Sequence, residues 1–316
     1  MKPEVLIMGA SQSQSVMDQF EQHFHCHHLW QVAASEQQAF IHGVAKNVRA
    51  VASTAMHGIS SALVDQLPRL EIVAVNGIGV DAVDFAATRA RAILVTNTPG
   101  VLTDDVADLA VLLMLAAARR LPQLHQYVRD GLWEQRVPVA MTSSVRGKVV
   151  GIFGFGRIGQ AIAARLEAFG VQLRYYQRST VTGTKAERSA SLMALAEESD
   201  FLIVCAPGGP ETRHIINADV MAKLGPDGIL VNIARGSLID EAAMTSALQE
   251  GRLGAAALDV FANEPMVPPA LRALNNVVLT PHVGSLTVET RHAMGQLVVD
   301  NLLAHFAGRP LLTPVA

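Results

Sequence analysis

The chain has 316 residues, of which 50% are hydrophobic and 17% are charged. At roughly 150 residues per domain, that length predicts two domains. The longest unbroken apolar run, Leu109–Ala118, is shorter than the ~20 residues of a membrane-spanning helix, and a net charge of −3 gives no electrostatic reason to expect nucleic acid or an anionic membrane as a partner.

The N-terminus and the cysteines predict a cytoplasmic protein. The apolar stretch within Met1–Gly9 is shorter than the ~7–15 residues of a signal-sequence core, and we expect it to form a buried strand instead. Cys26 and Cys205 are too few for a disulfide framework, which fits a reducing compartment.

Short apolar runs alternate with helical patterns along the chain, which is typical of a parallel α/β sheet. In the first third, this alternation predicts four strands with helical stretches between them, of which two are the clearest. The helices are Ser61–Gln66 and Val83–Ala90, and the strands are Glu4–Met8, Ala50–Ala52, Ile72–Val75 and Ile93–Thr96.

The next predicted element is a long helix, Asp104–Arg120. Its first turn holds aspartates and its last turn holds arginines, which complements the helix dipole. Its interior is apolar nearly all round, so we expect it to be buried. Because it is too apolar for a free surface, it is our candidate for the core of a homodimer interface.

From Lys148 onward the alternation becomes regular. The strands predicted here are Val149–Phe153, Gln172–Tyr176, Phe201–Cys205, Ile229–Ala234, Ala255–Asp259 and Val277–Leu279, followed by a last helix at Val288–Ala307. Parallel strands with helices between them match a doubly wound dinucleotide domain. With boundaries near Asn97–Gly100 and Leu286–Glu289, residues 98–288 would form this domain, inserted in a discontinuous substrate domain of residues 1–97 and 289–316.

The sharpest local signal is Gly154-Phe155-Gly156-Arg157-Ile158-Gly159. It directly follows the strand Val149–Phe153 and opens a helix predicted at Gln160–Phe169. In this context the first glycine permits a tight turn, the second lets the backbone approach a pyrophosphate, and the third allows the helix to pack closely on the strand. The start of the helix adds N–H donors for phosphate, so the motif predicts a dinucleotide site.

The end of the next strand predicts which dinucleotide binds. An NAD site places Asp or Glu about 20 residues on, where it accepts a hydrogen bond from the ribose 2′-hydroxyl. Here Gln177, Arg178 and Ser179 follow the strand, and no acid is present. A guanidinium beside hydroxyls binds a 2′-phosphate, which a carboxylate would repel. We therefore predict that NADP(H) is preferred, that Arg178 and Ser179 hold its 2′-phosphate, and that NAD(H) can also bind.

Polar motifs follow the last three strands. Arg235 follows Ile229–Ala234, Asp259 and Glu264 lie at and after the end of the next strand, and His282 follows the last one. Ligands of open α/β sheets bind beyond the carboxyl ends of the strands, so these side chains can converge. An arginine can hold an acid substrate with two hydrogen bonds, and a histidine beside a carboxylate can shuttle a proton.

Together these motifs resemble those of the D-isomer-specific 2-hydroxyacid dehydrogenases. The segments that carry the resemblance are Gly154–Gly159, Asn232–Gly236, Ala257–Phe261 with Glu264-Pro265, and Pro281–Gly284. It covers nearly the whole chain, because Asn76–Asp81 looks like that family's substrate-carboxylate loop. Within the family, the chain is most similar to the NADP-dependent glyoxylate/hydroxypyruvate reductases in its GFGRIG motif, Gln177–Ser179, Cys205–Pro210 and Trp133.

The resemblance implies a Rossmann coenzyme domain inserted in a discontinuous flavodoxin-like domain, both doubly wound. It also implies that hydride passes between the nicotinamide and the substrate's C2 while His282 donates a proton to the carbonyl oxygen. Glu264 would keep His282 protonated, and Arg235 would polarise the carbonyl and hold the carboxylate. Asp259 would bind the nicotinamide carboxamide, and no metal is needed.

Further residues complete the predicted site. Backbone N–H groups of Ile78 and Gly79 would hold the carboxylate, while Met56 and His57 would face the substrate's side chain or lie in a surface loop. Trp133 would reach a substrate pocket or pack in a subunit interface. The residues predicted to bind the cofactor are Gly154, Phe155, Gly156, Arg157, Ile158, Gly159, Gln177, Arg178, Ser179, Cys205, Ala206, Pro207, Thr212, Ile233, Ala234, Arg235, Asp259, His282 and Gly284.

The segment His23–His28 contains the residue types of a zinc or copper site. As a strand it would place only His23, His25 and His27 on one face, and no further group with ligand spacing accompanies it. We therefore predict an exposed strand or loop here rather than a metal site.

The sequence predicts a cytoplasmic, homodimeric reductase that uses NADPH to convert small 2-oxo acids of the glyoxylate or hydroxypyruvate type to D-2-hydroxy acids. We expect the two domains to close over the bound substrate, because hydride transfer requires water to be excluded. One alternative is the same chemistry on 2-ketogluconate or phenylpyruvate, since one methylene or hydroxyl shifts preference by only ~1–3 kcal/mol. A second is a non-enzymatic NAD(P)(H)-binding sensor or corepressor, against which the complete set of Arg, Glu and His argues.

Overall fold

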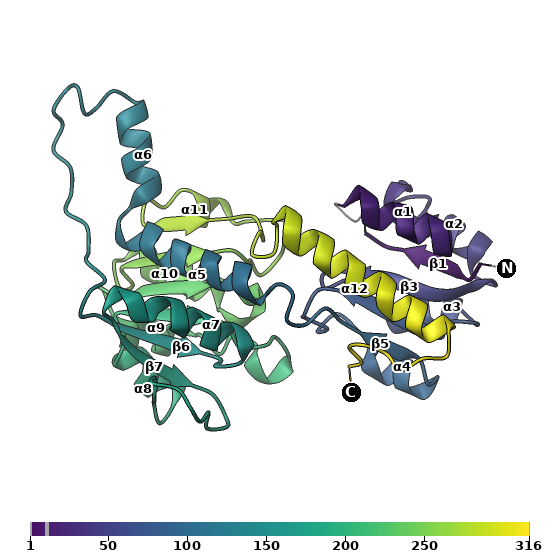
Figure 1. The fold of residues 1–316 in the computed structure, drawn as a ribbon. Coiled ribbons are helices and arrows are strands. Elements are labelled where there is room, and N and C mark those ends of the chain that lie inside the picture. The colour runs from purple at the N-terminus through teal and green to yellow at the C-terminus, as the bar shows by residue number, and fades with distance from the viewer. Residues whose placement is uncertain (1, 10–12, 316) are drawn as a thin grey trace. The chain divides into compact units, whose positions relative to one another are not determined.

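The computed structural model describes residues 2–9 and 13–315 (Figure 1). The chain divides into two compact units, which we call unit 1 (Met1–Leu102 with Ser285–Ala316) and unit 2 (Thr103–Gly284). Each unit contains one parallel sheet with helices between its strands. The predicted α/β class with two parallel sheets is therefore confirmed.

The sheet of unit 1 has the flavodoxin-like strand order β2-β1-β3-β4-β5. Its strands are β1 (Glu4–Ile7), β2 (His25–His28), β3 (Val48–Thr54), β4 (Ile72–Asn76) and β5 (Leu94–Thr96). Its helices are α1 (Gln14–His23), α2 (Gln37–Val44), α3 (Ser61–Gln66), α4 (Phe85–Ala90) and α12 (Val288–Phe306). Successive side chains of β1 enter opposite cores, Val5 beside α1 and α12 and Leu6 beside α2 and α3, so both faces of the sheet are covered.

The C-terminal part of the chain belongs to unit 1 because of α12. Val298, Val299 and Leu302 of this helix are buried against the sheet. Asn301, which is also fully buried, donates to Thr313 Oγ1 at 2.9 Å and accepts from the N–H groups of Leu312 and Thr313. These bonds attach Leu312 and Thr313 to the helix. The Val315 N–H donates to the carbonyl of Val95 in β5.

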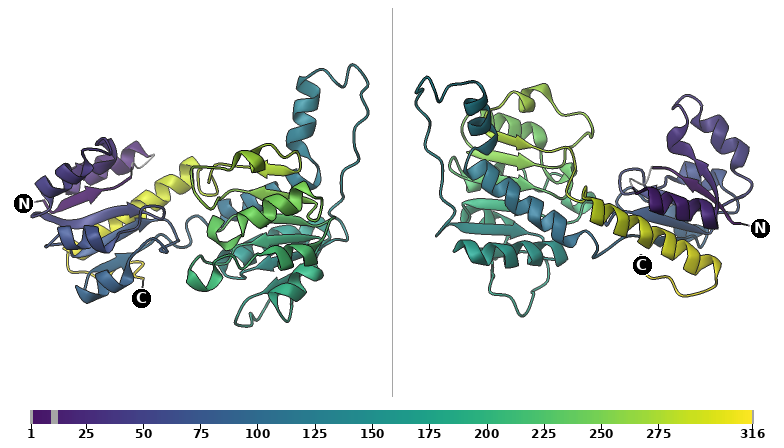
Figure 2. Two further views of the ribbon diagram at one scale, coloured as in Figure 1. Left: turned by 180° about the vertical axis from the view of Figure 1, so that it is seen from behind. Right: turned by 45° about the horizontal axis from the view of Figure 1, so that its top comes forward.

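The sheet of unit 2, which is drawn in teal and green in Figure 2, has the strand order β12-β11-β10-β9-β6-β7-β8. All neighbouring strands in it are parallel. Its strands are β6 (Val149–Phe153), β7 (Gln172–Tyr176), β8 (Glu187–Arg188), β9 (Phe201–Val204), β10 (Ile229–Asn232), β11 (Ala255–Leu258) and β12 (Val277–Leu279). The order reverses between β6 and β9, and dinucleotides bind at such a reversal.

Helices cover both faces of this sheet. The helices of unit 2 are α5 (Thr103–Ala118), α6 (Leu121–Arg129), α7 (Arg157–Leu166), α8 (Leu192–Glu197), α9 (Ala218–Leu224), α10 (Glu241–Gln249) and α11 (Pro269–Arg272). One core joins α8, α9 and α10 to one face, while α5 and α7 pack together and α5 lies along β10, β11 and β12. The short 3-10 segment Pro210–Thr212, which we call η3, follows β9.

The long helix predicted at Asp104–Arg120 is buried mainly within unit 2. Its alanines and most of its larger apolar residues are covered, and Leu112 is the one large apolar side chain of this helix that is more than half exposed. In contrast, α6 has no buried residue, and the chain after it projects from unit 2 before Ser143 N–H returns to the carbonyl of Ala118 (Figure 1). The apolar surface of unit 2 that stays exposed therefore lies mainly on α6 and on the chain that follows it.

The sequence patterns missed α1, α2, α6 and β8. Strand β8 consists of two exposed charged residues, so no apolar run marks it. The helix after the glycine motif begins at Arg157 rather than at Gln160. Within the segment His23–His28, His23 ends α1 and His25–His28 form the edge strand β2, where His25 is exposed and the other three residues are half-buried, and His27 bonds to Glu4 at 2.9 Å. Among residues 2–9 and 13–315, no helix is long and apolar enough to cross a membrane, and no cluster of His, Cys, Asp or Glu is arranged to hold a metal.

Candidate active site

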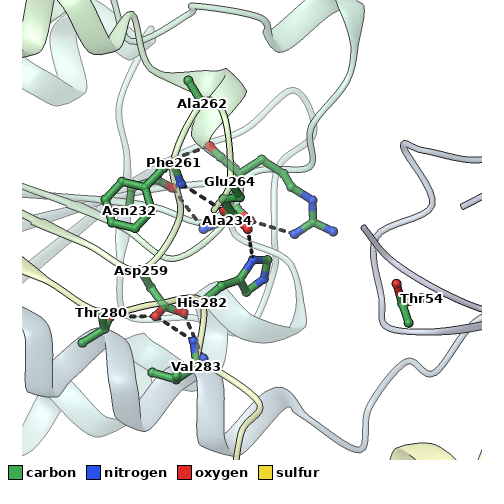
Figure 3. A network of polar contacts seen from close by, with 12 residues as sticks. Thr54, Asn232, Ala234, Asp259, Phe261, Ala262, Glu264, Thr280, His282 and Val283 are labelled. Carbon is green, nitrogen blue, oxygen red and sulfur yellow. Dashed lines mark hydrogen bonds and ion pairs between the residues drawn. The ribbon is translucent and has the colours of Figure 1, made fainter. Parts of the chain in front are cut away.

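Three turns of unit 2 lie beyond the carboxyl ends of β10, β11 and β12. They are Asn232–Gly236, Asp259–Glu264 and Thr280–Gly284, and we call them the catalytic turns. Because the three strands are parallel neighbours, their ends lie at one edge of the sheet. Figure 3 shows that residues of all three turns lie close together.

His282 and Glu264 form the central pair of the catalytic turns. His282 Nδ1 lies 2.7 Å from Glu264 Oε2, and the other carboxylate oxygen accepts from the Phe261 N–H at 3.0 Å (Figure 3). The Glu264 side chain is 16% exposed and that of His282 is 34% exposed. One ring nitrogen is thus held by the carboxylate, while the ring keeps access to solvent.

Glu264 stays ionised despite its burial. Burial alone would raise its pKa, but the hydrogen bonds from His282 and the Phe261 N–H outweigh this effect. The positive charges of His282 and Arg235 act in the same direction, so the pKa of Glu264 lies below its ordinary value of 4.5. The Glu264 carboxylate thus places a negative charge and a hydrogen-bond acceptor beside His282 Nδ1.

Asp259 fixes the turn that carries His282. Its carboxylate accepts from Thr280 Oγ1 at 2.6 Å, from Val283 N–H at 2.8 Å and from Gly284 N–H at 2.9 Å, and the residue is 1% exposed (Figure 3). His282 itself has a φ of +54°, a conformation that few residues other than glycine adopt. Strained backbone of this kind persists only where surrounding bonds enforce it, and the three bonds to Asp259 do so here.

A buried asparagine holds the turn that carries Arg235. Asn232, which is fully buried, accepts from the Ala234 N–H at 3.0 Å and donates to the Arg235 carbonyl at 2.9 Å. The next residue, Gly236, packs so tightly that a Cβ there would lie 1.9 Å from the Phe261 carbonyl carbon. The turn that carries Arg235 and the loop that carries Glu264 are therefore packed backbone to backbone.

The glycine motif has the geometry of a phosphate-binding turn. Gly154 has a φ of +93°, and a Cβ on it would lie 2.5 Å from the Ala206 nitrogen at the end of β9. A Cβ on Gly159 would meet the Gly154 carbonyl oxygen at 2.3 Å, whereas one on Gly156 would meet no atom within 4 Å. Gly154 and Gly159 thus allow close packing, whereas Gly156 faces open space at the start of α7. These residues fit a dinucleotide pyrophosphate.

The loop after β9 supports this turn. Cys205 donates from its thiol to the Gly154 carbonyl, and burial raises its pKa to about 12, so the thiol stays protonated and remains a donor. Farther along the loop, Thr212 Oγ1 donates to the carbonyl of Pro207 at 2.9 Å. The predicted residues Cys205, Ala206, Pro207 and Thr212 therefore form one ordered loop beside the glycine motif.

The residues predicted to hold the 2′-phosphate lie in the open at the end of β7. We call Gln177–Ser179 the ribose end. Gln177 Oε1 accepts from the Phe155 N–H at 3.1 Å, which links this end to the glycine motif, and Gln177 Nε2 donates to Ser179 Oγ at 3.3 Å. Arg178 is 88% exposed and donates to Glu211 at 2.9 Å.

The substrate residues predicted from the first third lie in unit 1. Met56 is exposed and His57 bonds to Thr54 Oγ1 at 2.7 Å, both in the turn after β3. Ile78 and Gly79 follow β4, and Asn97 Nδ2 donates to the Ile78 carbonyl at 2.8 Å. Trp133 lies on the chain after α6 and is 70% exposed. The roles of these residues stay predictions.

One residue of the catalytic turns and one that bonds to them from α10 had no role in the sequence analysis. Thr280 bonds to Asp259, and Glu241 at the start of α10 accepts from the Ala262 N–H at 3.1 Å. Thr280 lies directly after a predicted strand and two residues before His282, a signal that could have found it. Glu241 lies in none of the motifs of the sequence analysis, and only the fold brings it to this loop.

Comparison with known proteins decides the family. The family model for the D-isomer specific 2-hydroxyacid dehydrogenase NAD binding domain matches residues 111–284, which is more than half of the chain. The chain belongs to this family. It is therefore an NAD(P)-dependent oxidoreductase of the 2-hydroxyacid dehydrogenase type, and the predicted family and enzyme class are confirmed.

Its relatives cover nearly the whole chain. It is 47% identical to hydroxyphenylpyruvate reductase of Plectranthus scutellarioides and 46% identical to glyoxylate/hydroxypyruvate reductase A of Arabidopsis thaliana, in each case over 98% of both chains. Among solved structures, the NADPH-dependent glyoxylate/hydroxypyruvate reductase of Sinorhizobium meliloti in complex with NADP and malonate is 43% identical, with a TM-score of 0.90 over 100% of this chain and 97% of that one.

Proposed function

We propose that this dehydrogenase uses NADPH to reduce small 2-oxo acids, of the glyoxylate and hydroxypyruvate type, to D-2-hydroxy acids. The observation that carries the proposal is the His282–Glu264 pair held at 2.7 Å beside the turn of Arg235. The names of the Arabidopsis and Sinorhizobium relatives, both glyoxylate/hydroxypyruvate reductases, support the substrate class.

The proton in this reaction would come from His282. Nδ1 is bonded to Glu264, so Nε2 is the ring atom that would donate to the substrate's carbonyl oxygen. The depressed pKa of Glu264 keeps a negative charge beside the ring, which favours the imidazolium before transfer. Each turnover consumes this proton, and the ring regains one from solvent, to which it is partly exposed.

Arg235 would bind the substrate and polarise the reacting carbonyl. A guanidinium offers paired donors that match a carboxylate, and its permanent charge stabilises the oxyanion that develops at C2. The carbonyl of Arg235 is held by Asn232, so the residue's backbone is fixed before substrate arrives. In unit 1, the N–H groups of Ile78 and Gly79 remain our predicted donors to the substrate carboxylate.

NADPH supplies the hydride when it is bound. Gly154–Gly159 and the start of α7 would hold its pyrophosphate, while Arg178 and Ser179 would hold its 2′-phosphate. Asp259 already accepts hydrogen bonds from three donors of the Thr280–Gly284 turn, so its predicted contact to the carboxamide would use an oxygen that already accepts a hydrogen bond. We therefore assign Asp259 first to positioning His282.

Aromatic 2-oxo acids are a second substrate class to consider. The Plectranthus relative is a hydroxyphenylpyruvate reductase and is 47% identical to this chain. Small changes in a pocket shift such preferences by only ~1–3 kcal/mol, so one protein can accept both classes.

A substrate panel tests the proposal. Oxidation of NADPH would be followed by absorbance with glyoxylate, hydroxypyruvate, 4-hydroxyphenylpyruvate and 2-ketogluconate, and repeated with NADH. We expect the highest kcat/KM with hydroxypyruvate or glyoxylate and NADPH, and a product of D configuration. A higher kcat/KM with 4-hydroxyphenylpyruvate would replace the proposed substrate class, and no oxidation with any acid would contradict the function.

We also propose that two copies of the chain associate through α6 and the chain that follows it. Val128, Trp133, Val139 and Met141 are between 50% and 96% exposed there, and such an apolar surface is typical of an interface. Light scattering on wild-type protein should give twice the mass of one chain. Val139→Asp should shift the mass toward that of one chain, whereas Leu312→Asp, an equally exposed apolar position in unit 1, should not.

The remaining assignments follow from these proposals. Unit 2 would be the dinucleotide domain and unit 1 the substrate domain. A cytoplasmic location is supported by Cys26 and Cys205, which are both free thiols.

A further inference from the structure

The fold brings an acid to the ribose end, although the sequence places none there. Glu211 lies in η3, 33 residues after Arg178, and its Oε2 accepts from Arg178 Nη1 at 2.9 Å. Within residues 2–9 and 13–315, this is the only hydrogen bond of the Arg178 side chain. The guanidinium predicted to bind a 2′-phosphate is therefore already paired with a carboxylate of the same unit.

This ion pair can be displaced. Its two side chains are 88% and 79% exposed, and exposed ion pairs change an equilibrium constant by no more than about fivefold. A phosphate dianion carries more charge than a carboxylate and can accept two parallel bonds from one guanidinium. A 2′-phosphate would thus replace Glu211 on Arg178.

A second cation lies beside the same backbone. Arg188 in β8 donates from Nη2 to the carbonyls of Gln177 and Arg178, both at 3.1 Å. The guanidinium groups of Arg178 and Arg188 therefore both lie at the ribose end, and Glu211 partly offsets their positive charge. Removing this carboxylate would leave the end more positive and more favourable to a phosphate.

We propose that Glu211 is a specificity-determining residue that lowers the preference for NADPH over NADH. Binding of a 2′-phosphate must break the pair between Glu211 and Arg178, whereas binding of NADH leaves it intact. The inference rests on the proposed role of Arg178. It assigns to Glu211 the weakening of NADPH binding, and it leaves the catalytic turns untouched.

The test is calorimetric binding of adenosine 2′,5′-bisphosphate and of 5′-AMP, which differ only in the 2′-phosphate. Glu211→Gln keeps the shape of the side chain and removes its charge. We expect the variant to bind the bisphosphate three- to fivefold more tightly than wild type at low salt, with 5′-AMP binding changed less than twofold. The gain should shrink at high ionic strength, where exposed charges are screened.

Two further variants isolate the cause. In an Arg178→Gln background, the Glu211→Gln substitution should give a smaller gain than in wild type, because no ion pair is left to break. Glu197→Gln is the matched control, because Glu197 also forms an exposed ion pair, at 2.9 Å from Lys223 and with 61% of its side chain exposed. Glu197 is the last residue of α8 and lies at the edge of the sheet opposite the ribose end. It should change neither affinity.

The outcomes separate this inference from the proposed cofactor preference. If wild type prefers the bisphosphate and Glu211→Gln leaves its affinity unchanged, the role of Glu211 is wrong and the cofactor preference stands. If wild type binds both nucleotides equally and the variant gains preference for the bisphosphate, the role of Glu211 is supported and the NADPH preference of wild type is wrong. If neither protein distinguishes the nucleotides, both are overturned.

Discussion

The catalytic turns and the ribose end lie at the same edge of one sheet but are built differently. In the catalytic turns, Asn232 and Asp259 are buried, and their side chains hold backbone groups next to Arg235 and His282. At the ribose end, Arg178 and Glu211 are exposed and meet through one ion pair. The first arrangement fixes geometry, while the second sets an affinity that one charge can change. This difference predicts that substitutions in the catalytic turns strongly lower the reaction rate. Substitutions at the ribose end should instead change the preference between NADPH and NADH.

The largest expected effect is at His282. His282→Gln removes the proton donor and should lower kcat/KM for the 2-oxo acid by about 10²–10⁴-fold. His42→Gln, an exposed histidine on α2, is the control and should leave kcat/KM unchanged. Steady-state kinetics at saturating NADPH measure both. Activity of His282→Gln within threefold of wild type would remove His282 from the mechanism.

A substitution at Asp259 tests whether buried bonds position His282. Asp259→Asn replaces one acceptor oxygen with a donor that faces N–H groups, which costs about 1–3 kcal/mol. For a unit of this size, the melting temperature should fall by about 3–9 °C, and kcat should fall with it. Asp227→Asn, at an exposed turn, should change neither quantity. An unchanged melting temperature and kcat in Asp259→Asn would show that the turn holds its shape without these bonds.

A smaller, pH-dependent effect is expected at Glu264. Its pKa is below 4.5 in the folded protein, so its ionised form stabilises the fold at higher pH, and this stabilisation is lost as pH falls through the folded pKa. Glu264→Gln should therefore lower the melting temperature at pH 7 by a few degrees, for a loss of about 1 kcal/mol, and the gap should narrow toward pH 3. Differential scanning fluorimetry across this range measures it. A gap that widens as pH falls would reverse the assigned sign.

The sequence predicted the catalytic turns more completely than the ribose end, for a physical reason. Arg235, Glu264 and His282 lie within six residues of the ends of β10, β11 and β12, and parallel strands place their ends together whatever the helices do. Even the start of the helix after the glycine motif was misplaced by only one turn. Glu211 could not be found in this way, because its contact with Arg178 depends on the path of the loop after β9.

The same reasoning explains which helices and strands the sequence did not predict. The short strand β8 consists of two charged residues, and α1 and α6 are short amphipathic helices with few apolar residues, so none of them contains an apolar run. The apolar helix α5 was predicted correctly, but its composition reflects burial within unit 2, on β10, β11, β12 and α7. Composition alone does not tell whether a helix is covered by its own chain or by a second copy.

The most direct test measures kcat/KM for hydroxypyruvate with NADPH and with NADH in wild type, Arg178→Gln and His282→Gln. The account predicts that Arg178→Gln lowers the NADPH value about tenfold while the NADH value changes less than twofold, because a charge-assisted bond to phosphate is lost. It predicts that His282→Gln lowers both values by the same large factor. Equal losses with both cofactors in Arg178→Gln, or a loss with only one cofactor in His282→Gln, would contradict the division between the two regions.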